Sequence, residues 1–220
     1  MRHPGSRTRL EVIHGRAAIR AVFDGADAVP MPMGRDGALV WRRTDHLVVR
    51  RDPVGGRMLL AARYGTTGRD PFLLLDDLAV SDSMTSGETD ELTCRHMVAA
   101  LLLRLAALED LPAALVTHAD NVVLARAFQA LAGSVADTVL YPIPDSSVIP
   151  LRSAAMAHRI ARAIGVPAWS GKGPSAPNLM TLDLRATFED DMLPVLSKLF
   201  RQRSAHRPAT PMQQRSARAS

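Results

Sequence analysis

Three polar side chains that can transfer protons lie in or directly after apolar runs of this sequence. Asp76 and Asp77 lie within residues 72–80, and His118 follows residues 113–117. A carboxylate can accept a proton and histidine titrates near neutral pH, so both types suit general acid–base catalysis, which typically contributes about 10²- to 10⁴-fold in rate. Structural roles also fit these residues. Either aspartate could cap a helix or pair with an arginine, and His118 could be hydrogen-bonded within a loop.

The pattern of residues 72–80 predicts the strand that carries the two aspartates. Its sequence, Phe-Leu-Leu-Leu-Asp-Asp-Leu-Ala-Val, is a nearly continuous apolar run, as in strands covered on both faces. Side chains alternate along a strand, so we expect Asp76 to share a face with Leu74, Leu78 and Val80, while Asp77 points the other way. We expect His118 at the end of the next strand, where clefts of open α/β sheets usually form.

The surrounding elements predict a mixed α/β fold. Two strand-like runs at 46–51 and 57–64 flank Asp52-Pro-Val-Gly-Gly56 and predict an antiparallel hairpin. The strand at 72–80 is followed by a polar loop at 81–90, a helix at 91–108, a strand at 113–117, a helix at 121–131 and a strand at 135–143. This order predicts a parallel strand pair with a right-handed crossover, attached to the hairpin.

The remaining segments are assigned to the same domain. A strand at 10–13 and a helix at 16–23 precede the hairpin. A helix at 151–164, a strand at 179–184 and a helix at 188–200 are expected to form a C-terminal extension, residues 151–200. The sequence thus predicts one domain over residues 10–200, with disordered basic tails at 1–9 and 201–220.

The positive charge of the chain comes from these tails. Residues 1–9 hold three arginines and residues 201–220 hold five, with no acidic residue in either, so the net charge of +5 leaves residues 10–200 at −3. The high pI therefore does not indicate a basic binding face, and short basic tails give only salt-sensitive contacts. Only 4% of the residues are aromatic, too few for a base-stacking platform. Nucleic acid is not the expected partner.

Cysteine and hydropathy patterns indicate a cytoplasmic protein. Cys94 is the only cysteine, which excludes an intrachain disulfide and a cysteine-based zinc site and suits a reducing compartment. The histidines other than His118 show no metal-ligand spacing, so no metal is expected. The longest apolar stretch, 97–108, is short and interrupted by Arg104, so no membrane is expected either. The Ala, Arg and Leu bias with two lysines is typical of a GC-rich bacterial genome.

The element order and one motif resemble the GCN5-related N-acetyltransferase superfamily over about residues 10–143. The most specific piece is Val116-Thr-His-Ala-Asp-Asn121, followed by Leu124, Phe128, Leu131 and Gly133. It is similar to the family's stretch in which a strand ends at an Asn, a helix packs over it and a Gly precedes the last hairpin. The resemblance implies a mixed, mostly antiparallel sheet with a splayed parallel strand pair and flanking helices. It also implies acetyl-CoA or another acyl-CoA as co-substrate.

The resemblance further implies which residues meet the co-substrate. Residues 75–80 look like the family's splayed strand, which lays its backbone against the pantetheine arm of acetyl-CoA. The matching positions are Leu78, Ala79 and Val80, and Asn121 and Phe128 would lie near the same ligand.

Catalytic roles follow from the same resemblance. In the family, the strand face shared with Val80 tends to meet the substrate, so Asp76 is the first candidate for the base and Asp77 the second. The family often has a tyrosine that acts as the general acid seven residues after the Asn, and this chain has Phe128 at that position. Tyr141 on the following strand is a candidate substitute, although a strand tyrosine is also commonly a core residue.

One loop departs from the family pattern. Relatives carry Arg/Gln-x-x-Gly-x-Gly/Ala there, because bare glycine amides and a helix N-terminus cradle the pyrophosphate. Here residues 81–90 contain a single glycine. If Thr89 caps the next helix, the acids at 88, 90 and 91 would repel a diphosphate. If Thr93 is the cap, Arg95 and His96 lie in the first turn and could face it, and the sequence leaves both starts open.

Two functions are therefore predicted. The first is an acyl-CoA-dependent N-acyltransferase that moves an acetyl group directly to a small-molecule or peptide amine. The second is a non-catalytic binding or regulatory module of the same fold that has lost the pyrophosphate loop. The glycine-poor acidic loop favours the second, and the Asp-Asp strand with the Asn-led helix favours the first. The acceptor is left open, and so is the oligomeric state, including a homodimer.

Overall fold

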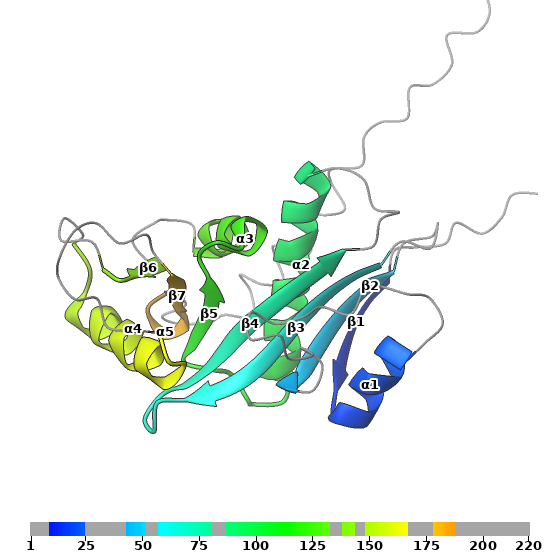
Figure 1. Ribbon diagram of the computed structural model, residues 1–220, viewed down its shortest axis with the longest axis horizontal. Helices are drawn as coiled ribbons and strands as arrows, with labels where there is room; N and C mark the ends of the chain where they lie inside the picture. The colour runs from blue at the N-terminus through cyan, green and yellow to red at the C-terminus, as the bar shows by residue number, and fades with distance from the viewer. Residues whose placement is uncertain are drawn as a thin grey trace, which may run out of the picture.

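The described part of the structure is built around one seven-stranded sheet. The computed structural model describes residues 9–24, 43–51, 57–80, 87–132, 138–143, 148–166 and 178–187. Its strands are β1 (Arg9–His14), β2 (His46–Arg51), β3 (Arg57–Thr66), β4 (Pro71–Val80), β5 (Ala114–His118), β6 (Thr138–Tyr141) and β7 (Leu179–Asp183). They lie in the order β1-β2-β3-β4-β5-β7-β6 (Figure 1).

All strand pairs are antiparallel except β4 with β5, which is parallel. The predicted mixed, mostly antiparallel sheet with one parallel pair is thereby confirmed, and so is the β2–β3 hairpin. The turn between β2 and β3 lies outside the described residues.

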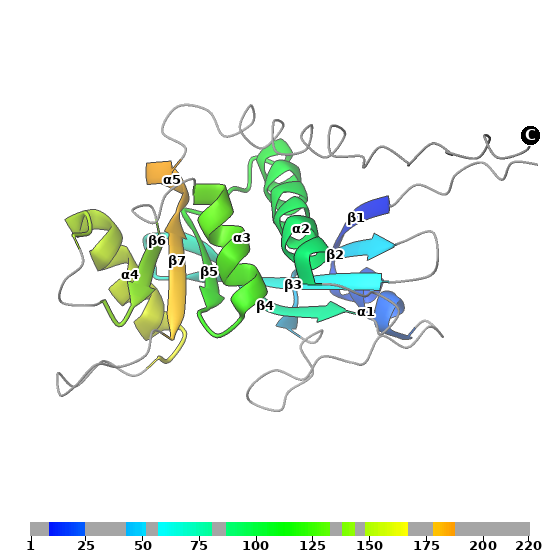
Figure 2. The ribbon, with the colours of Figure 1, turned by 90° about the horizontal axis from the view of Figure 1, so that it is seen from above.

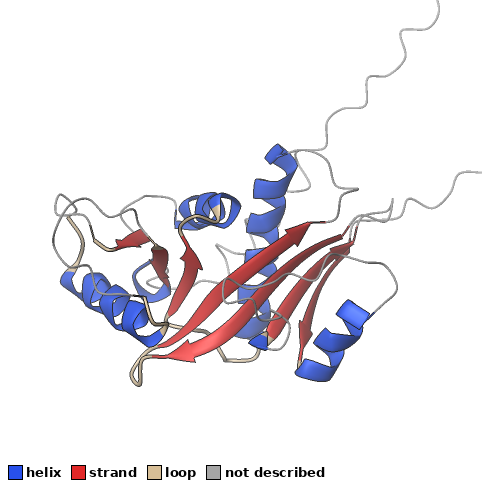
Figure 3. Cartoon of the chain, in the orientation of Figure 1, coloured by secondary structure: helices blue, strands red, loops and turns tan. Residues whose placement is uncertain are grey.

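Helices cover both faces of this sheet (Figure 3). α2 (Gly87–Ala107) and α3 (Val122–Ala132) pack side by side on one face, which we call the α2/α3 face (Figure 2). α1 (Arg16–Asp24) and α4 (Leu151–Ala163) pack on the opposite face, the α1/α4 face. The short helix α5 (Leu184–Thr187) directly follows β7. None of the helices in the described part of the chain combines the length and apolar character needed to cross a membrane.

The apolar run in β4 builds the core on both faces, as predicted. Leu73 and Leu75 join the cluster under α2 and α3, whereas Phe72 and Leu74 join the cluster under α4. All four side chains are at most 3% exposed. This double coverage explains why the run lacks the alternation of a strand with one solvated face.

The segment expected to be a C-terminal extension is instead part of the sheet. β7 lies between β5 and β6 and pairs antiparallel with both, and all five of its residues are buried. The predicted C-terminal extension, residues 151–200, thus contributes β7 to the middle of the sheet and α4 to one of its faces. The sequence pattern identified the strand but could not show that it pairs in the middle of the sheet. The helix predicted at 188–200 lies outside the described residues.

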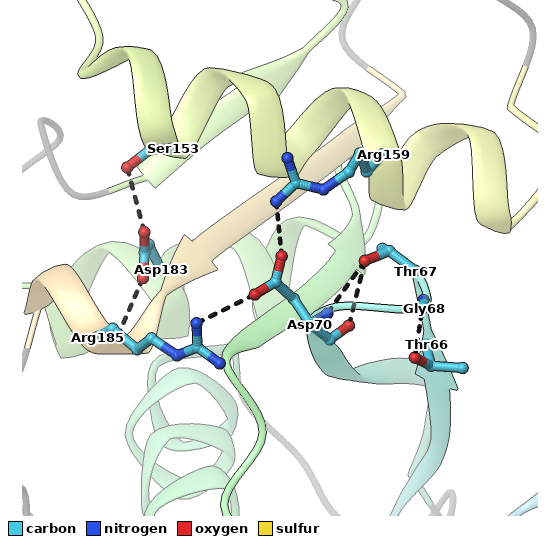
Figure 4. Close-up of polar contacts among 8 residues, drawn as sticks. All are labelled: Thr66, Thr67, Gly68, Asp70, Ser153, Arg159, Asp183 and Arg185. Carbon is cyan, nitrogen blue, oxygen red and sulfur yellow. Dashed lines mark hydrogen bonds and ion pairs between the residues drawn. The ribbon is translucent and has the colours of Figure 1, made fainter.

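The carboxylate of Asp70, in the turn between β3 and β4, binds an arginine of α4 (Figure 4). Asp70 accepts hydrogen bonds from Arg159 Nη2 on α4 at 2.6 Å and from Arg185 Nη1 on α5 at 3.0 Å. Asp183, at the end of β7, accepts from Ser153 Oγ on α4 at 3.2 Å and from the Arg185 N–H at 3.0 Å. The hydrogen bond from Arg159 is the main reason that the pKa of Asp70 lies below its usual value.

Candidate functional site

The parallel strands β4 and β5 separate after four paired positions. Their register runs from Phe72 opposite Ala114 to Leu75 opposite Thr117, and Thr117 Oγ1 donates to the Leu75 carbonyl at 3.3 Å. β4 then continues to Val80, whereas β5 ends at His118, and Figure 1 shows the two strands diverging. Within the described residues, positions 77–80 pair only with β3. No strand of the described part of the chain therefore pairs with the β5 side of this backbone segment, and an edge of this kind is where extended ligands can pair.

A β-bulge at Asp76 lies at the start of this open segment. On β3, Ala62 lies opposite Leu75 and Ala61 lies opposite Asp77, so Asp76 is the extra residue. The bulge shifts the alternation by one position. Leu75 and Leu78 consequently both pack on the α2/α3 face, although three residues separate them.

Both aspartates therefore lie on the α1/α4 face. Asp77 lies opposite Ala61, which belongs to the cluster under α1. Asp76 contacts Arg63, whose register partner Leu74 belongs to the cluster under α4. The prediction that Asp76 shares a face with Leu78 while Asp77 points the other way is wrong, because strict alternation does not hold across a bulge.

Asp76 is a buried anion that faces arginines. Its side chain is 6% exposed, and its Oδ2 lies 2.7 Å from Arg63 Nε and 3.9 Å from Arg43 Nε. Neither Nε–H is aligned with this oxygen as a hydrogen bond requires, so these are contacts between charges. Asp76 thus has the structural role considered as the alternative to catalysis, because it pairs with an arginine.

Asp77 has the properties of the better base. It is half-buried, and burial raises the pKa of its carboxyl, with a partial offset from the Leu78 N–H that donates to Oδ1 at 2.8 Å. A carboxylate with a raised pKa holds a proton more strongly than an ordinary aspartate and is therefore a stronger base. The predicted order of the two base candidates stays a prediction, and the ion pair of Asp76 with Arg63 leaves Asp77 better suited to the role.

His118 and Asn121 lie where β5 ends. His118 and Asp76 are the first residues beyond the last paired positions of the two strands, and His118 is half-buried. The His118 carbonyl accepts a hydrogen bond from the Asn121 N–H at 3.0 Å. Asn121 Oδ1 accepts from the Leu124 N–H at 3.3 Å, so its side chain caps α3. The Asn-led helix is therefore confirmed, with the amide oxygen of Asn121 engaged in capping.

The two aromatic candidates are core residues. Phe128 is fully buried in the cluster under α2 and α3 and presents no surface to a ligand. Tyr141 is 5% exposed and packs under α4, with the His158 ring edge-on at 5.2 Å between centroids. The core alternative for Tyr141 matches its surroundings.

Neither predicted start of the long helix is correct. α2 already includes Gly87, so Thr89 and Thr93 are both inside it and neither caps it. Arg95 and His96 consequently lie about two turns into the helix, and His96 is 3% exposed. The anion site expected from these two residues at a helix N-terminus is therefore not formed. Residues 81–86 lie outside the described ranges.

A pocket of about 220 Å³ opens on the α1/α4 face, and Arg63, the ion-pair partner of Asp76, lies in its wall. β3 and β4 contribute Arg63, Tyr64, Gly65, Thr66, Phe72 and Leu74, and the end of α4 contributes Ala163 and Ile164. Gly65 lies opposite Phe72, and a Cβ at this position would overlap the Phe72 ring. Glycine is thus required for the ring to lie across β3 at the base of the pocket.

Sequence reasoning missed Arg63, which lines the pocket and holds Asp76. One feature of the sequence could have identified it, namely an arginine inside the apolar run of β3. Pairing of β3 with β4 as an antiparallel hairpin would have placed this arginine near an aspartate of β4. No group of three or more His, Cys, Asp or Glu side chains that could hold a metal occurs in the described ranges. No family model, curated protein or solved structure matches the chain.

Proposed function

We propose that this protein is a cytoplasmic acyl-CoA-dependent N-acyltransferase that acts by direct transfer to an amine. The observation that carries the proposal is the combination, within six residues, of a bulge and an open strand edge. β4 leaves β5 after Leu75, bulges at Asp76 and exposes the backbone of residues 76–80 beside a carboxylate whose pKa burial has raised. The separation of β4 from β5 is what the resemblance to GCN5-related N-acetyltransferases implies for the strand that binds the pantetheine arm.

In the proposed reaction, Asp77 takes a proton from the ammonium group of the acceptor. The free amine attacks the thioester carbonyl, the C–N bond forms, the attacking nitrogen loses its second proton to become the amide, and the C–S bond breaks with release of the CoA thiolate. An N–H group of residues 76–80 other than that of Leu78, which donates to Asp77 Oδ1, would polarise the carbonyl, since hydrogen-bond donors directed at a developing oxyanion stabilise it. The thiolate recovers a proton when it leaves, and half-buried His118 at the end of β5 is the nearest candidate by strand position.

A second function is favoured by one observation at the start of α2. The sequence of its first turn contains Glu88 and Asp90, and Arg95 and His96 lie farther along the helix. Acids at a helix N-terminus repel a diphosphate. A module that keeps the fold but binds a different partner would explain this arrangement.

Calorimetric titration with acetyl-CoA, longer acyl-CoAs and acetyl-pantetheine separates these functions. An N-acyltransferase binds at least one CoA ester, and failure of all of them would sink the proposal. Because β4 would hold the pantetheine arm and the acids of α2 would weaken any diphosphate contact, we expect acetyl-pantetheine to bind nearly as well as acetyl-CoA. A large advantage of acetyl-CoA would instead indicate a nucleotide site elsewhere.

A further inference from the structure

The wall of the pocket includes an arginine, Arg63, whose side chain forms an ion pair with Asp76 and is partly exposed. Arg63 is 33% exposed at its side chain, and its Nε faces Asp76 Oδ2. Arg63 also lines the pocket, and among the described residues its ion pair is with Asp76. The N–H groups of a guanidinium form a planar fork that matches a carboxylate.

Arg63 also links the pocket to the strand segment that carries the two aspartates. Its Nε lies 2.7 Å from Asp76 Oδ2, and Asp76 and Asp77 are consecutive residues that project to the same face of the sheet as the pocket. The wall of the pocket includes Arg63 but neither aspartate.

The size of the pocket limits what can bind. A volume of about 220 Å³ lies below the range of about 300–1,000 Å³ typical of drug-sized ligands. It suits a single small molecule. Phe72, Leu74 and Ile164 line it with carbon, and the polar groups are at Arg63 and Thr66.

We propose that the pocket formed by β3, β4 and the end of α4 binds a small amine that carries a carboxylate, with Arg63 as the residue that recognises the carboxylate. This assignment rests on the proposed function for the identity of the amine as acyl acceptor, and it selects the amino-acid class within the broader class of amines. Asp76 is then a positioning residue that contacts Arg63.

The test uses product analogues that need no turnover. The full chain is titrated by calorimetry with N-acetyl-L-leucine and with N-acetyl-L-leucinamide, which differ only in the carboxylate. A hydrogen-bonded charge pair predicts about 10- to 100-fold tighter binding of the acid. Arg63→Gln should remove this ratio, and Arg63→Lys should retain a part of it because the charge remains without the fork. Arg69→Gln is the matched control, since Arg69 is exposed in the neighbouring turn.

The outcomes separate this assignment from the proposed function. Equal affinity for the two probes, or a ratio that survives Arg63→Gln, overturns the assignment even if acetyl-CoA binds. A ratio that depends on Arg63 in a protein that binds no CoA ester supports the carboxylate site and overturns the acyltransferase. If Arg63→Gln fails to fold, the ratio in the native chain and in Arg63→Lys decides.

Discussion

Arg63 Nε lies 2.7 Å from Asp76 Oδ2, and the two residues come from neighbouring strands that pair antiparallel. The bulge makes this contact possible because it places Asp76 on the α1/α4 face without moving Leu75 or Leu78 from the opposite face. Asp76 thus forms an ion pair with Arg63, and burial raises the pKa of the neighbouring Asp77.

Asp76→Asn is expected to destabilise the fold. It leaves Arg63 and Arg43 without their buried counter-charge, and because both arginines are about one-third exposed we expect a loss of about 1–3 kcal/mol, below the cost of breaking a fully buried pair. Urea unfolding of Asp76→Asn, Arg63→Gln and the double variant measures the coupling between them. Additive losses would mean that the two side chains do not stabilise each other.

Asp77→Asn is expected to separate activity from stability. Loss of the base should lower kcat by about 10²- to 10⁴-fold. The folded-state pKa of Asp77 is raised, so its charged form costs stability above that pKa, and the variant should unfold at the same or a higher temperature at pH 7. The readouts are thiol release with acetyl-CoA and a thermal melt, with Asp76→Asn as the matched neighbour. Retained turnover would place the base elsewhere.

The pH–rate profile of the native protein is a further readout for Asp77. The base must be deprotonated, so kcat/KM should rise with pH and level off above its pKa, at a higher pH than an ordinary aspartate would give. An acidic limb that persists in Asp77→Asn would assign the titration to another group.

Asp70→Asn is expected to loosen α4. Arg159 and Arg185 are 41% and 48% exposed at their side chains, so removing their shared carboxylate should cost only about 1–2 kcal/mol. The pKa of Asp70 is lowered, so its stabilisation is present above the unfolded-state value near 4 and is lost as the pH falls through the folded-state value. Hydrogen exchange should rise in the amides of α4, whereas Arg69→Gln in the same turn should leave them protected. Unchanged exchange in Asp70→Asn would show that other contacts hold α4.

His14 and His46 are expected to make the fold sensitive to mild acid. Their Nδ1 atoms lie 2.5 Å apart at the end of the β1–β2 ladder, and both Nε2 atoms are buried without a hydrogen bond. Burial is the main cause that lowers both pKa values. The charge of Arg104 lowers the pKa of His14 further. The pKa of His46 is lowered further by His14 and is raised in part by Asp45 and Asp110. Two protonated rings cannot share this contact because both nitrogens would be donors.

The direction of the pH effect follows from these lowered values. The unfolded chain binds more protons than the folded chain below about pH 6.5, so stability is complete above that value and declines as the pH falls toward the folded-state pKa values. Chemical unfolding at pH 7.5, 6.5 and 5.5 measures the slope. Arg104→Gln should reduce it, because Arg104 contributes to the lowered pKa of His14. A flat profile in the native protein would contradict the assignment.

The sequence by itself determined the elements and the fold class. The apolar run at 72–80 and the Asn that caps α3 act through local physics, namely strand burial and a hydrogen bond to the next helical turn. Such signals depend on residues close together in the chain, so they are readable without the tertiary structure.

Only the tertiary structure decided the site. A bulge changes which face every later side chain occupies, and its position depends on the pairing of β4 with β3, which a single strand does not encode. The same is true of β7, which enters the sheet between β5 and β6 although it comes last in the chain. Arg63 became part of the site for this reason. Its partner Asp76 is thirteen residues away, and only the register of two paired strands brings the two charges together.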